Sequence, residues 1–357
     1  MATTAATGLT VQQWDDKFFT EYVQANRFAK YFGTNENSII QVKQDLTKKK
    51  GDSLTYALVN RLTGAGVTGT TSLEGSEEDL ASRSHQLTVD KIRNGVLVAE
   101  MEEQRSAISL RNAARATLKT WIMEQTRDDI IAALHSINGT AYGSANAAAR
   151  NAWLVDNADR VLFGDAIGNG GYTTHATDLA AVTAGMTLSG DIVSLAKRIA
   201  LSADPKIRPV TVNGDEEWYV MFVNSQQYRD LKVDLKASNT DANVRGKENP
   251  IFSGESILWD GVIVRHISDM NSLVENSGAA SAPIAPAFLC GAQAVGMGWA
   301  KRTTSKQETF DYGDKQGVAI EEIRGIEKLT FGSGSADTDD LKDNGVVTVW
   351  TSSPADA

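Results

Sequence analysis

The side chains in this sequence that most often do chemistry are one cysteine and four histidines. The histidines are His85, His135, His175 and His266. They lie far apart, and no His-Glu-x-x-His or other metal-ligand spacing joins any two of them. Cys290 lies in the apolar run Phe288-Leu-Cys-Gly291, where a small buried residue is the usual interpretation. We therefore expect no catalytic residues, no cofactor-binding residues and no metal ligands, although a Cys–His pair assembled only by folding would escape any sequence pattern.

Two short stretches imitate ligand-binding motifs. Gly64-Ala-Gly-Val-Thr-Gly69 has the spelling of a dinucleotide-binding turn, but that motif needs a helix directly after the glycines, and here a loop continues through Thr70–Gly75. Asp337-Thr-Asp-Asp340 resembles the start of a calcium loop, yet Leu341 and Lys342 occupy positions that need an oxygen ligand and a glycine. We interpret the first as a flexible hairpin tip and the second as a solvated acidic turn.

The overall composition is that of a globular protein. Hydrophobic residues make up 41% and charged residues 22% of 357 residues, a length that suggests about two domains. The net charge of −10 leaves no domain-wide positive field for binding nucleic acid, and a single cysteine fits a reducing compartment. Met1–Thr10 has no signal-peptide pattern and no apolar run is long enough for a membrane span, so we expect synthesis in the cytoplasm and no membrane partner.

The first structural element predicted is an amphipathic helix near the N-terminus. Thr10-Val-Gln-Gln13 has the pattern of a capping box, in which the hydroxyl and the amide satisfy the free N–H groups of a first helical turn. One face of this helix is apolar and consists of Val11, Trp14, Phe18 and Tyr22. The segment has too few apolar positions to close a core of its own, so it must dock on another surface.

Two strands with a Gly- and Thr-rich connection predict a long hairpin arm. The first strand, 53–63, carries Leu54, Tyr56, Leu58 and Leu62 on one face. The second, 85–98, changes the parity of its apolar residues after Val89, which indicates a bulge. Strands of this length would reach about 40 Å, and an isolated two-stranded ribbon is marginal in water. We therefore expect the apolar face of the arm to be covered by a neighbouring subunit.

A helix over 102–135 is predicted by a stretch that contains neither glycine nor proline. At about 50 Å it would form a structural spine. After it we expect loops with short helices through residue 189, and then a compact α/β segment. That segment comprises helices at 190–201 and 225–231 and strands at 217–223, 257–259, 262–266 and 287–291. The remaining predicted strands are 301–309, 317–323 and 328–331, followed by a tail, 332–357, with a short strand at 346–350.

This order of elements, from arm to hairpin to spine helix to α/β segment to returning strand, resembles the Hong Kong 97 capsid fold. The chain is similar to major capsid proteins of tailed bacteriophages, most of all to those of the coliphage N-four type. The resemblance rests on seven blocks between residues 10 and 331. They are Asn37-Ser-Ile-Ile-Gln41, Gly51-Asp-Ser-Leu-Thr55, Leu73-Glu-Gly-Ser-Glu-Glu78, Asn249-Pro-Ile-Phe-Ser-Gly254, Trp259-Asp-Gly261, Gly291-Ala-Gln-Ala294 and Phe310-Asp-Tyr-Gly313.

The resemblance implies an α+β chain with a defined domain plan. The plan consists of an N-terminal arm (1–47), an extended β-hairpin loop (48–100), a peripheral domain with the spine helix (101–185), an axial domain (186–295), a return to the peripheral domain (296–335) and a C-terminal tail (336–357). Proteins of this type self-assemble into hexamers and pentamers of an icosahedral shell around double-stranded DNA, which they touch only non-specifically. The implied partners are further copies of the chain, a portal, a separate scaffolding protein and in some cases a decoration protein, and the implied location is the virion.

Charge offers one hypothesis of its own about assembly. The hairpin tip carries Glu74, Glu77, Glu78 and Asp79, whereas Lys48-Lys-Lys50 lies at the base of the arm. An acidic tip and a basic surface can pair between subunits. Two other classes of protein stay open from the residues alone: a cytosolic α/β enzyme or ligand-binding protein, and another self-assembling sheath or shell protein.

Overall fold

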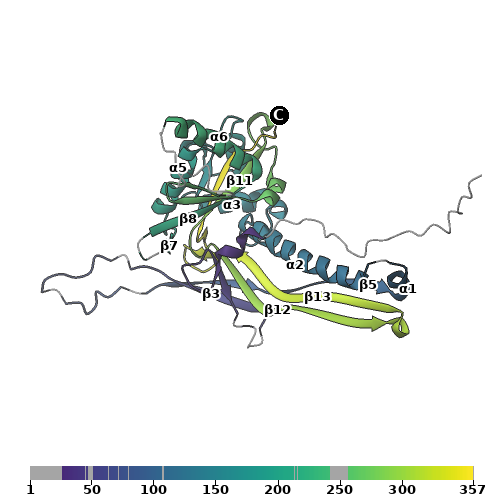
Figure 1. The fold of residues 1–357 in the computed structure, drawn as a ribbon. Helices are drawn as coiled ribbons and strands as arrows, with labels where there is room; N and C mark the ends of the chain where they lie inside the picture. Colours follow the sequence, from purple (N-terminus) through teal and green to yellow (C-terminus); the bar gives the residue numbers. More distant parts are fainter. Residues whose placement is uncertain are drawn as a thin grey trace, which may run out of the picture.

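The computed structural model describes residues 26–44, 46, 51–62, 64–70, 72–78, 80–106, 108–212, 214, 216–241 and 256–356, with the backbone alone for 237–241. The chain forms a body of sheet and helices with two extensions that point in opposite directions (Figure 1). One extension is the loop between β3 and β4, and the other is a ribbon of β5, β12 and β13 backed by α2. No helix in the described part of the chain is long and apolar enough to span a membrane.

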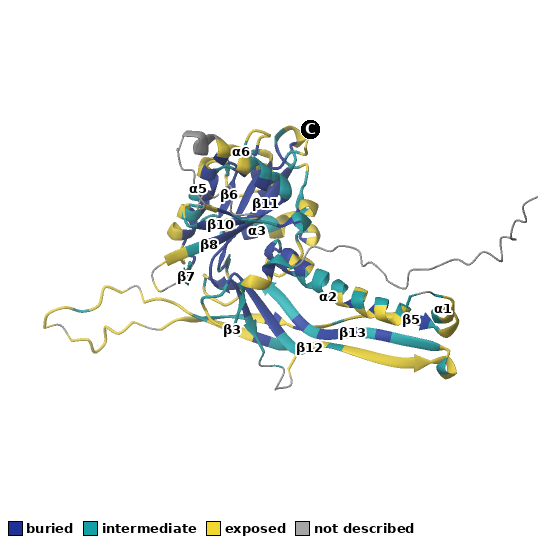
Figure 2. Ribbon diagram, in the orientation of Figure 1, coloured by how far each residue is buried: buried dark blue, intermediate teal, exposed yellow. Residues whose placement is uncertain are grey.

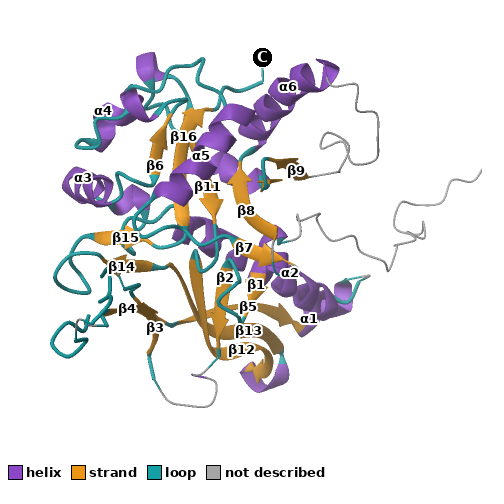
Figure 3. Cartoon of the chain, turned by 90° about the vertical axis from the view of Figure 1, so that its left-hand side faces the viewer, coloured by secondary structure: helices purple, strands orange, loops and turns teal. Residues whose placement is uncertain are grey.

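The body is built on a seven-stranded mixed sheet in the order β6-β16-β11-β8-β10-β9, with β7 paired to β8. Its strands are β6 (Val161–Phe163), β7 (Val210–Val212), β8 (Glu216–Val223), β9 (Ser256–Trp259), β10 (Val262–His266), β11 (Ile284–Cys290) and β16 (Val346–Ser352). The helices α5 (Gly190–Ser202) and α6 (Ser225–Asp241) lie across one face (Figure 3), and their apolar stripes bury the main core against the sheet.

A five-stranded sheet, in the order β1-β2-β12-β13-β5, connects the body to the ribbon. Its strands are β1 (Phe32–Gly33), β2 (Ile40–Lys43), β5 (Asp90–Ala99), β12 (Val295–Phe310) and β13 (Lys315–Lys328). At about 3.3 Å per residue the 16-residue strand β12 spans about 50 Å, so the long arm of this molecule is the β12–β13 hairpin. Its inner face packs on α2 (Leu110–Leu134) through Val318 and Ile320.

Smaller elements complete the fold. The remaining strands form two short pairs, β3 (Ser53–Val59) with β4 (Ser82–Thr88) and β14 (Thr330–Gly332) with β15 (Leu341–Asp343). The remaining helices are α1 (Glu100–Arg105), α3 (Ala147–Asp156) and α4 (His175–Ala180), together with short 3-10 turns such as η2 (Arg27–Tyr31). The outer half of β12 and the β3–β4 loop are largely exposed, whereas the central strands of the body are buried (Figure 2).

The predicted hairpin arm 53–98 is wrong in its second strand. β4 pairs with β3 over seven residues, and after Val89 the chain leaves that pair and enters the five-stranded sheet, where β5 pairs with β13. The parity change read as a bulge is therefore the point at which the chain changes sheets.

The apolar face of the β3–β4 hairpin also differs from its prediction, because it is buried by its own chain. Leu54, Tyr56 and Leu87 are almost fully buried. They pack against three glycines, Gly296, Gly298 and Gly325. A Cβ added at any of these glycines would come within 2.0–2.8 Å of another atom, which belongs to the β4 backbone, to a hairpin side chain or to the Leu329 side chain. The Tyr56 hydroxyl donates to the carbonyl oxygens of Gln41 and Met297, both at 3.1 Å. Three glycines in β12 and β13 thus let the hairpin dock closely without a neighbouring subunit.

The single spine helix predicted over 102–135 is two helices, α1 and α2. Ser106 adopts an extended backbone, and the Ser109 side chain accepts from the Asn112 amide to cap α2. Glu103 carboxylate oxygens accept from the Leu110 amide at 3.0 Å and from the Ser109 hydroxyl at 3.2 Å. Serine side chains that bond to nearby backbone compete with the helix, so a segment free of glycine and proline still breaks.

Other predicted elements are confirmed. The helix expected at 190–201 is α5, and the strand 217–223 is β8. The Asp260-Gly261 turn joins β9 to β10 with positive φ at both residues, as a type I′ hairpin turn requires. The strand expected at 346–350 is β16. It lies inside the seven-stranded sheet between β6 and β11, so the prediction that it belongs to a tail is wrong. The helix expected from Thr10, Lys48-Lys-Lys50 and the block Asn249–Gly254 lie outside the described residues.

Candidate functional site

Folding brings two of the four histidines together in the body. His135 stacks on Tyr142 with ring centroids 4.1 Å apart, and His175 lies 5.8 Å from the same tyrosine and 5.7 Å from Trp350. Burial, with the cations Lys328 and Arg150 nearby, lowers the pKa of His135 to about 3 and that of His175 to about 4. Both rings are therefore neutral at pH 7 and serve as packing groups of an aromatic core.

The other chemically notable residues are also structural. His85 lies beside Thr330 and Glu327, whereas His266 stacks on Tyr228 at 5.4 Å, so neither joins the buried pair. Cys290 is fully buried in β11, and burial raises its pKa, so its thiol is not a reactive nucleophile. No group of acidic, histidine or cysteine side chains in the described residues has the arrangement of a metal site.

The two stretches that resemble ligand-binding motifs lie in exposed or connecting segments. Gly64–Gly69 is an exposed part of the β3–β4 loop with positive φ at Gly66 and Gly69, and no helix follows it. The acidic turn at Asp337–Asp340 holds the β3–β4 hairpin to the rest of the chain: the Ser84 hydroxyl donates to Asp337 at 2.6 Å, and Arg83 donates to the Gly334 carbonyl at 2.5 Å. The first stretch therefore lies in a hairpin loop and the second forms an acidic turn, as predicted.

The remaining candidates for a functional site are exposed surfaces. The first is the β3–β4 loop, residues 60–81, which we call the acidic loop. Leu62, Leu73 and Leu80 are 58–67% exposed in this loop, although leucine side chains are usually buried. Its backbone is ordered by its own carboxylates, because Glu77 accepts from the Gly75 amide at 2.7 Å and Glu78 accepts from the Gly64 amide at 2.6 Å.

The second surface is the face of the ribbon that points away from α2, which we call the ribbon trough. It has a volume of about 550 Å³ and lies over Gly95, Gly317 and Ala319. Leu97 and Phe310 form its apolar walls and are 55% and 46% exposed. At the end nearer the body, Lys91, Lys301 and Lys306 all pair with Glu321 and lower the pKa of its carboxyl far below its usual value.

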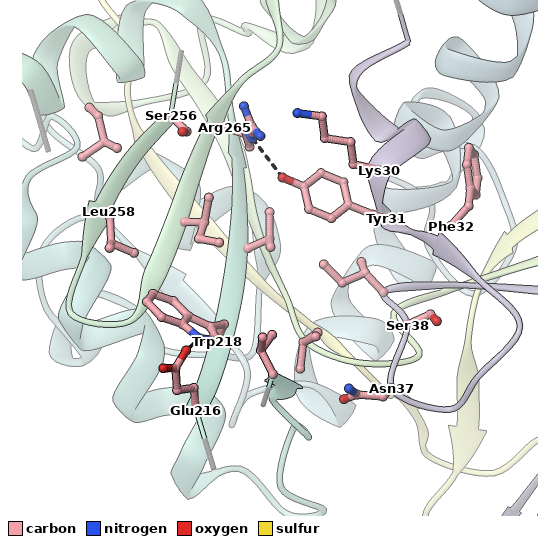
Figure 4. Close-up of a pocket in the computed structure, with 16 residues that line it drawn as sticks. Lys30, Tyr31, Phe32, Asn37, Ser38, Glu216, Trp218, Ser256, Leu258 and Arg265 are labelled. Atoms are coloured by element: carbon pink, nitrogen blue, oxygen red, sulfur yellow. Dashed lines mark hydrogen bonds between the residues drawn. The ribbon is translucent and has the colours of Figure 1, made fainter. Parts of the chain in front are cut away.

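The third surface is an apolar groove of about 670 Å³ between η2 and the edge of the seven-stranded sheet (Figure 4). Lys30 and Tyr31 lie on one side of it, and Trp218 and Leu258 lie on the other. The Arg265 guanidinium donates to the Tyr31 hydroxyl at 2.9 Å and joins the two sides. Most of its lining side chains are apolar, as is typical of a packing surface.

The fold matches solved phage capsid structures over almost the whole chain. The chain superimposes on the capsid of cyanophage Pam1 with a TM-score of 0.88 and 35% identity, with 99% of each chain covered. It superimposes on the capsid of Ralstonia phage GP4 with a TM-score of 0.76 and 25% identity, with 100% of each chain covered. The capsid structure of Helicobacter pylori bacteriophage KHP30, at 16% identity and a TM-score of 0.67, shares the fold. The class defined by this fold is the Hong Kong 97-type capsid protein.

The sequence comparisons narrow that class to a family. The family model described as phage capsid protein matches residues 2–355, so the chain belongs to the phage capsid protein family. The major capsid protein of Pseudomonas phage KPP25 is 29% identical over 362 residues, which cover 94% of this chain and 93% of that protein. The predicted fold and the predicted role as a capsid protein are confirmed. The protein is a structural component of the virion that associates with copies of itself.

The ribbon trough was missed by the sequence analysis. Its residues come from three strands, two of which are more than 200 residues apart from the third in the chain. A signal was present in the small residues Gly317 and Ala319, which alternate with the apolar Val318 and Ile320. In a strand covered on one face, such alternation places the small residues together on the other face.

Proposed function

We propose that this protein forms hexamers and pentamers that close into an icosahedral shell around double-stranded phage DNA. The observation that carries the proposal is the shape of the chain, with an exposed acidic loop at one end and an exposed ribbon at the other. A chain that leaves six or more large apolar side chains exposed along its extensions gains stability by contact with copies of itself.

The experiment is expression of the protein with and without candidate scaffolding proteins from the same phage, followed by sedimentation and electron microscopy. We expect rings or closed shells. A chain that stays monomeric at high concentration under all these conditions would refute the proposal.

Within this shell we propose the division into a peripheral and an axial domain. The five-stranded sheet with α2 is a unit of the peripheral domain, and the seven-stranded sheet with α5 and α6 is the centre of the axial domain. The axial unit also includes β6 and β16, which lie outside the interval 186–295 expected for this domain. The N-terminal arm and the extended loop, which contains the β3–β4 hairpin, complete the division. Limited proteolysis of the unassembled protein is expected to cut first in the loop 60–81 and to leave both sheets intact.

We further propose that the protein has no catalytic activity and touches DNA without reading its sequence. A net charge of −10 supports a container that holds DNA without binding it tightly, because basic surfaces bind phosphates strongly. A separate scaffolding protein, a portal and a decoration protein are the proposed partners, and the host cytoplasm is the proposed place of synthesis. Pull-down of tagged capsid protein from infected cells before DNA packaging tests these partners. A capsid that closes correctly without any of them would contradict the proposal of a separate scaffolding protein.

A further inference from the structure

The first half of α2 carries a row of positive charges. Arg111, Arg115 and Lys119 follow one another at intervals of four residues, so they lie on one side of the helix, about 6 Å apart along its axis. All three side chains are exposed, and residues 106–123 contain no acidic residue. We call these three side chains the basic stripe. In a chain whose net charge is −10, the stripe is a local reversal of sign.

The packing of α2 fixes the direction in which the basic stripe points. Leu118 and Ile122 are buried against the ribbon, whose other face contains the trough. Lys119 comes one residue after Leu118, which turns its side chain about 100° away from the packed side of the helix. Because α2 lies along one face of the ribbon (Figure 1), the stripe belongs to the surface of the molecule opposite the trough.

The stability of the helix does not account for the stripe. The dipole of a helix favours carboxylates in the first turn and cations in the last turn. α2 has the reverse order, because Arg111 lies in its first turn, whereas its acidic residues begin at Glu124. Neither Arg111 nor Lys119 forms an ion pair within the part of the chain that the structure describes. A charge pattern that opposes the helix carrying it indicates a role in binding.

The chemistry of the stripe favours a polyanion as its partner. No large apolar side chain of α2 belongs to the exposed ones, although contacts between proteins have an apolar centre. Contacts with nucleic acid are instead polar and strongly positive on the protein side. Double-stranded DNA carries a negative charge about every 1.7 Å along its axis, so a row of cations about 12 Å long faces several phosphates.

We propose that the basic stripe of α2 binds the phosphate backbone of the double-stranded DNA inside the shell. The inference rests on the proposed function, and it adds the residues that touch the DNA. It also turns the α2 side of the ribbon towards the interior of the shell and the trough side away from it. Phosphate contacts carry no sequence information, so three cations hold any DNA weakly and without preference.

The first experiment measures binding of the unassembled protein to a DNA duplex of arbitrary sequence at several salt concentrations. Each phosphate contact contributes about −0.9 to the slope of log affinity against log salt, so three contacts give about −2.7. Between about 50 and about 200 mM salt, the natural chain is therefore expected to lose about 40-fold in affinity. The stripe variant, Arg111→Gln with Arg115→Gln and Lys119→Gln, is expected to bind at least about tenfold more weakly at the lower concentration and to lose most of the slope.

The matched control removes three exposed cations from the body and is expected to keep the natural slope. It is Arg198→Gln with Lys206→Gln and Lys232→Gln. Glutamine has nearly the helix propensity of arginine and lysine, and the stripe opposes the dipole, so the stripe variant is expected to unfold at or slightly above the natural temperature. The inference would be overturned by a natural chain that does not bind, by an unchanged slope in the stripe variant or by an equal loss in the control.

The second experiment identifies the partner inside filled particles. A photoreactive amino acid replaces Arg115 in capsid protein that is supplied to infected cells, and illumination of the purified particles is expected to cross-link the protein to DNA. The same amino acid in place of Glu308, an exposed residue of the trough on the opposite face of the ribbon, is expected to give at least about tenfold less DNA cross-linking.

The outcomes separate this contact from the proposed function. Cross-linking from the position of Arg115 to a protein instead of DNA, or equal DNA cross-linking from both positions, would refute the contact and leave the proposed function standing. A protein that forms no rings or shells at all would refute both.

Discussion

At the residue scale, the buried histidine pair makes stability depend on pH. The pKa values of His135 and His175 fall from the ordinary 6.5 to about 3 and about 4 in the folded chain. Between these values and 6.5 the unfolded chain binds protons that the folded chain does not, so stability is complete above pH 6.5 and is lost as pH falls towards 4.

We expect the free energy of unfolding to fall by up to about 1.4 kcal/mol per pH unit for each histidine in this window. Urea unfolding at pH 7.5, 5.5 and 4.5 measures the effect. His135→Phe keeps an aromatic ring against Tyr142 and is expected to reduce the slope. An unchanged slope in this variant would assign the acid sensitivity to other groups.

A second residue-scale prediction concerns the ion pair of Lys328 and Asp343, whose side chains are both only 1% exposed. The ammonium donates to Asp343 at 2.7 Å and to the Ser136 carbonyl at 2.8 Å. Lys328→Met leaves a buried carboxylate without its cation, and we expect a loss of about 3–5 kcal/mol.

The double variant Lys328→Met with Asp343→Leu is expected to recover most of that loss, because an apolar pair replaces a desolvated ionic one. Lys315→Met is the matched control: it removes an exposed pair with Asp311 and is expected to change stability by less than about 1 kcal/mol. Denaturant midpoints of the variants compare these losses directly. Equal losses for the buried and the exposed lysine would contradict the argument.

At the scale of elements, the sequence predicted those that are determined by local residues. Ser189 caps α5, and Asp260-Gly261 forces the turn between β9 and β10, so both elements were found. Of the candidate surfaces, only the acidic loop was predicted, because its four charges lie within residues 74–79. The ribbon trough is assembled from strands distant in sequence, and no local pattern reveals such a set.

The predictions that were wrong concern elements whose partners lie far away in the chain. Whether Val89 continues a hairpin or enters another sheet is decided by β13, which lies more than 200 residues later. The strand β6 has three residues and is fully buried, so its sequence is too short to carry a period.

The element-scale prediction concerns β16, which the sequence alone suggested was part of a tail. All seven of its residues are buried, and it pairs with β11 over its whole length and with β6 on its other side. A chain that ends at Asp340 is expected to be insoluble or unfolded by circular dichroism, because the two halves of the sheet lose their common strand. A chain that ends at Ser353 keeps every strand and is expected to fold.

At the scale of the whole molecule, folding and assembly depend on different surfaces. Both sheets and their cores are complete within one copy, and the β3–β4 hairpin is buried by β12 and β13 of the same chain. The acidic loop contributes no residue to any of the buried clusters described. The loop is thus dispensable for the stability of the subunit, although it has the exposure and charge of a contact surface.

This separation can be tested by replacing residues 61–80 with an Asn-Gly turn. The Asn60 amide donates to the Ala81 carbonyl at 2.9 Å, so the two ends already lie at the spacing of a tight hairpin, and Asn-Gly supplies the positive φ values of a type I′ turn. We expect the shortened chain to unfold within a few degrees of the natural chain in a thermal scan, because no core residue is lost. We also expect it to sediment as a monomer under conditions in which the natural chain forms rings or shells. Normal assembly without the loop would move the contact between copies to other surfaces, such as the apolar groove beside η2, whereas a large fall in the unfolding temperature would mean that the loop belongs to the folding unit after all.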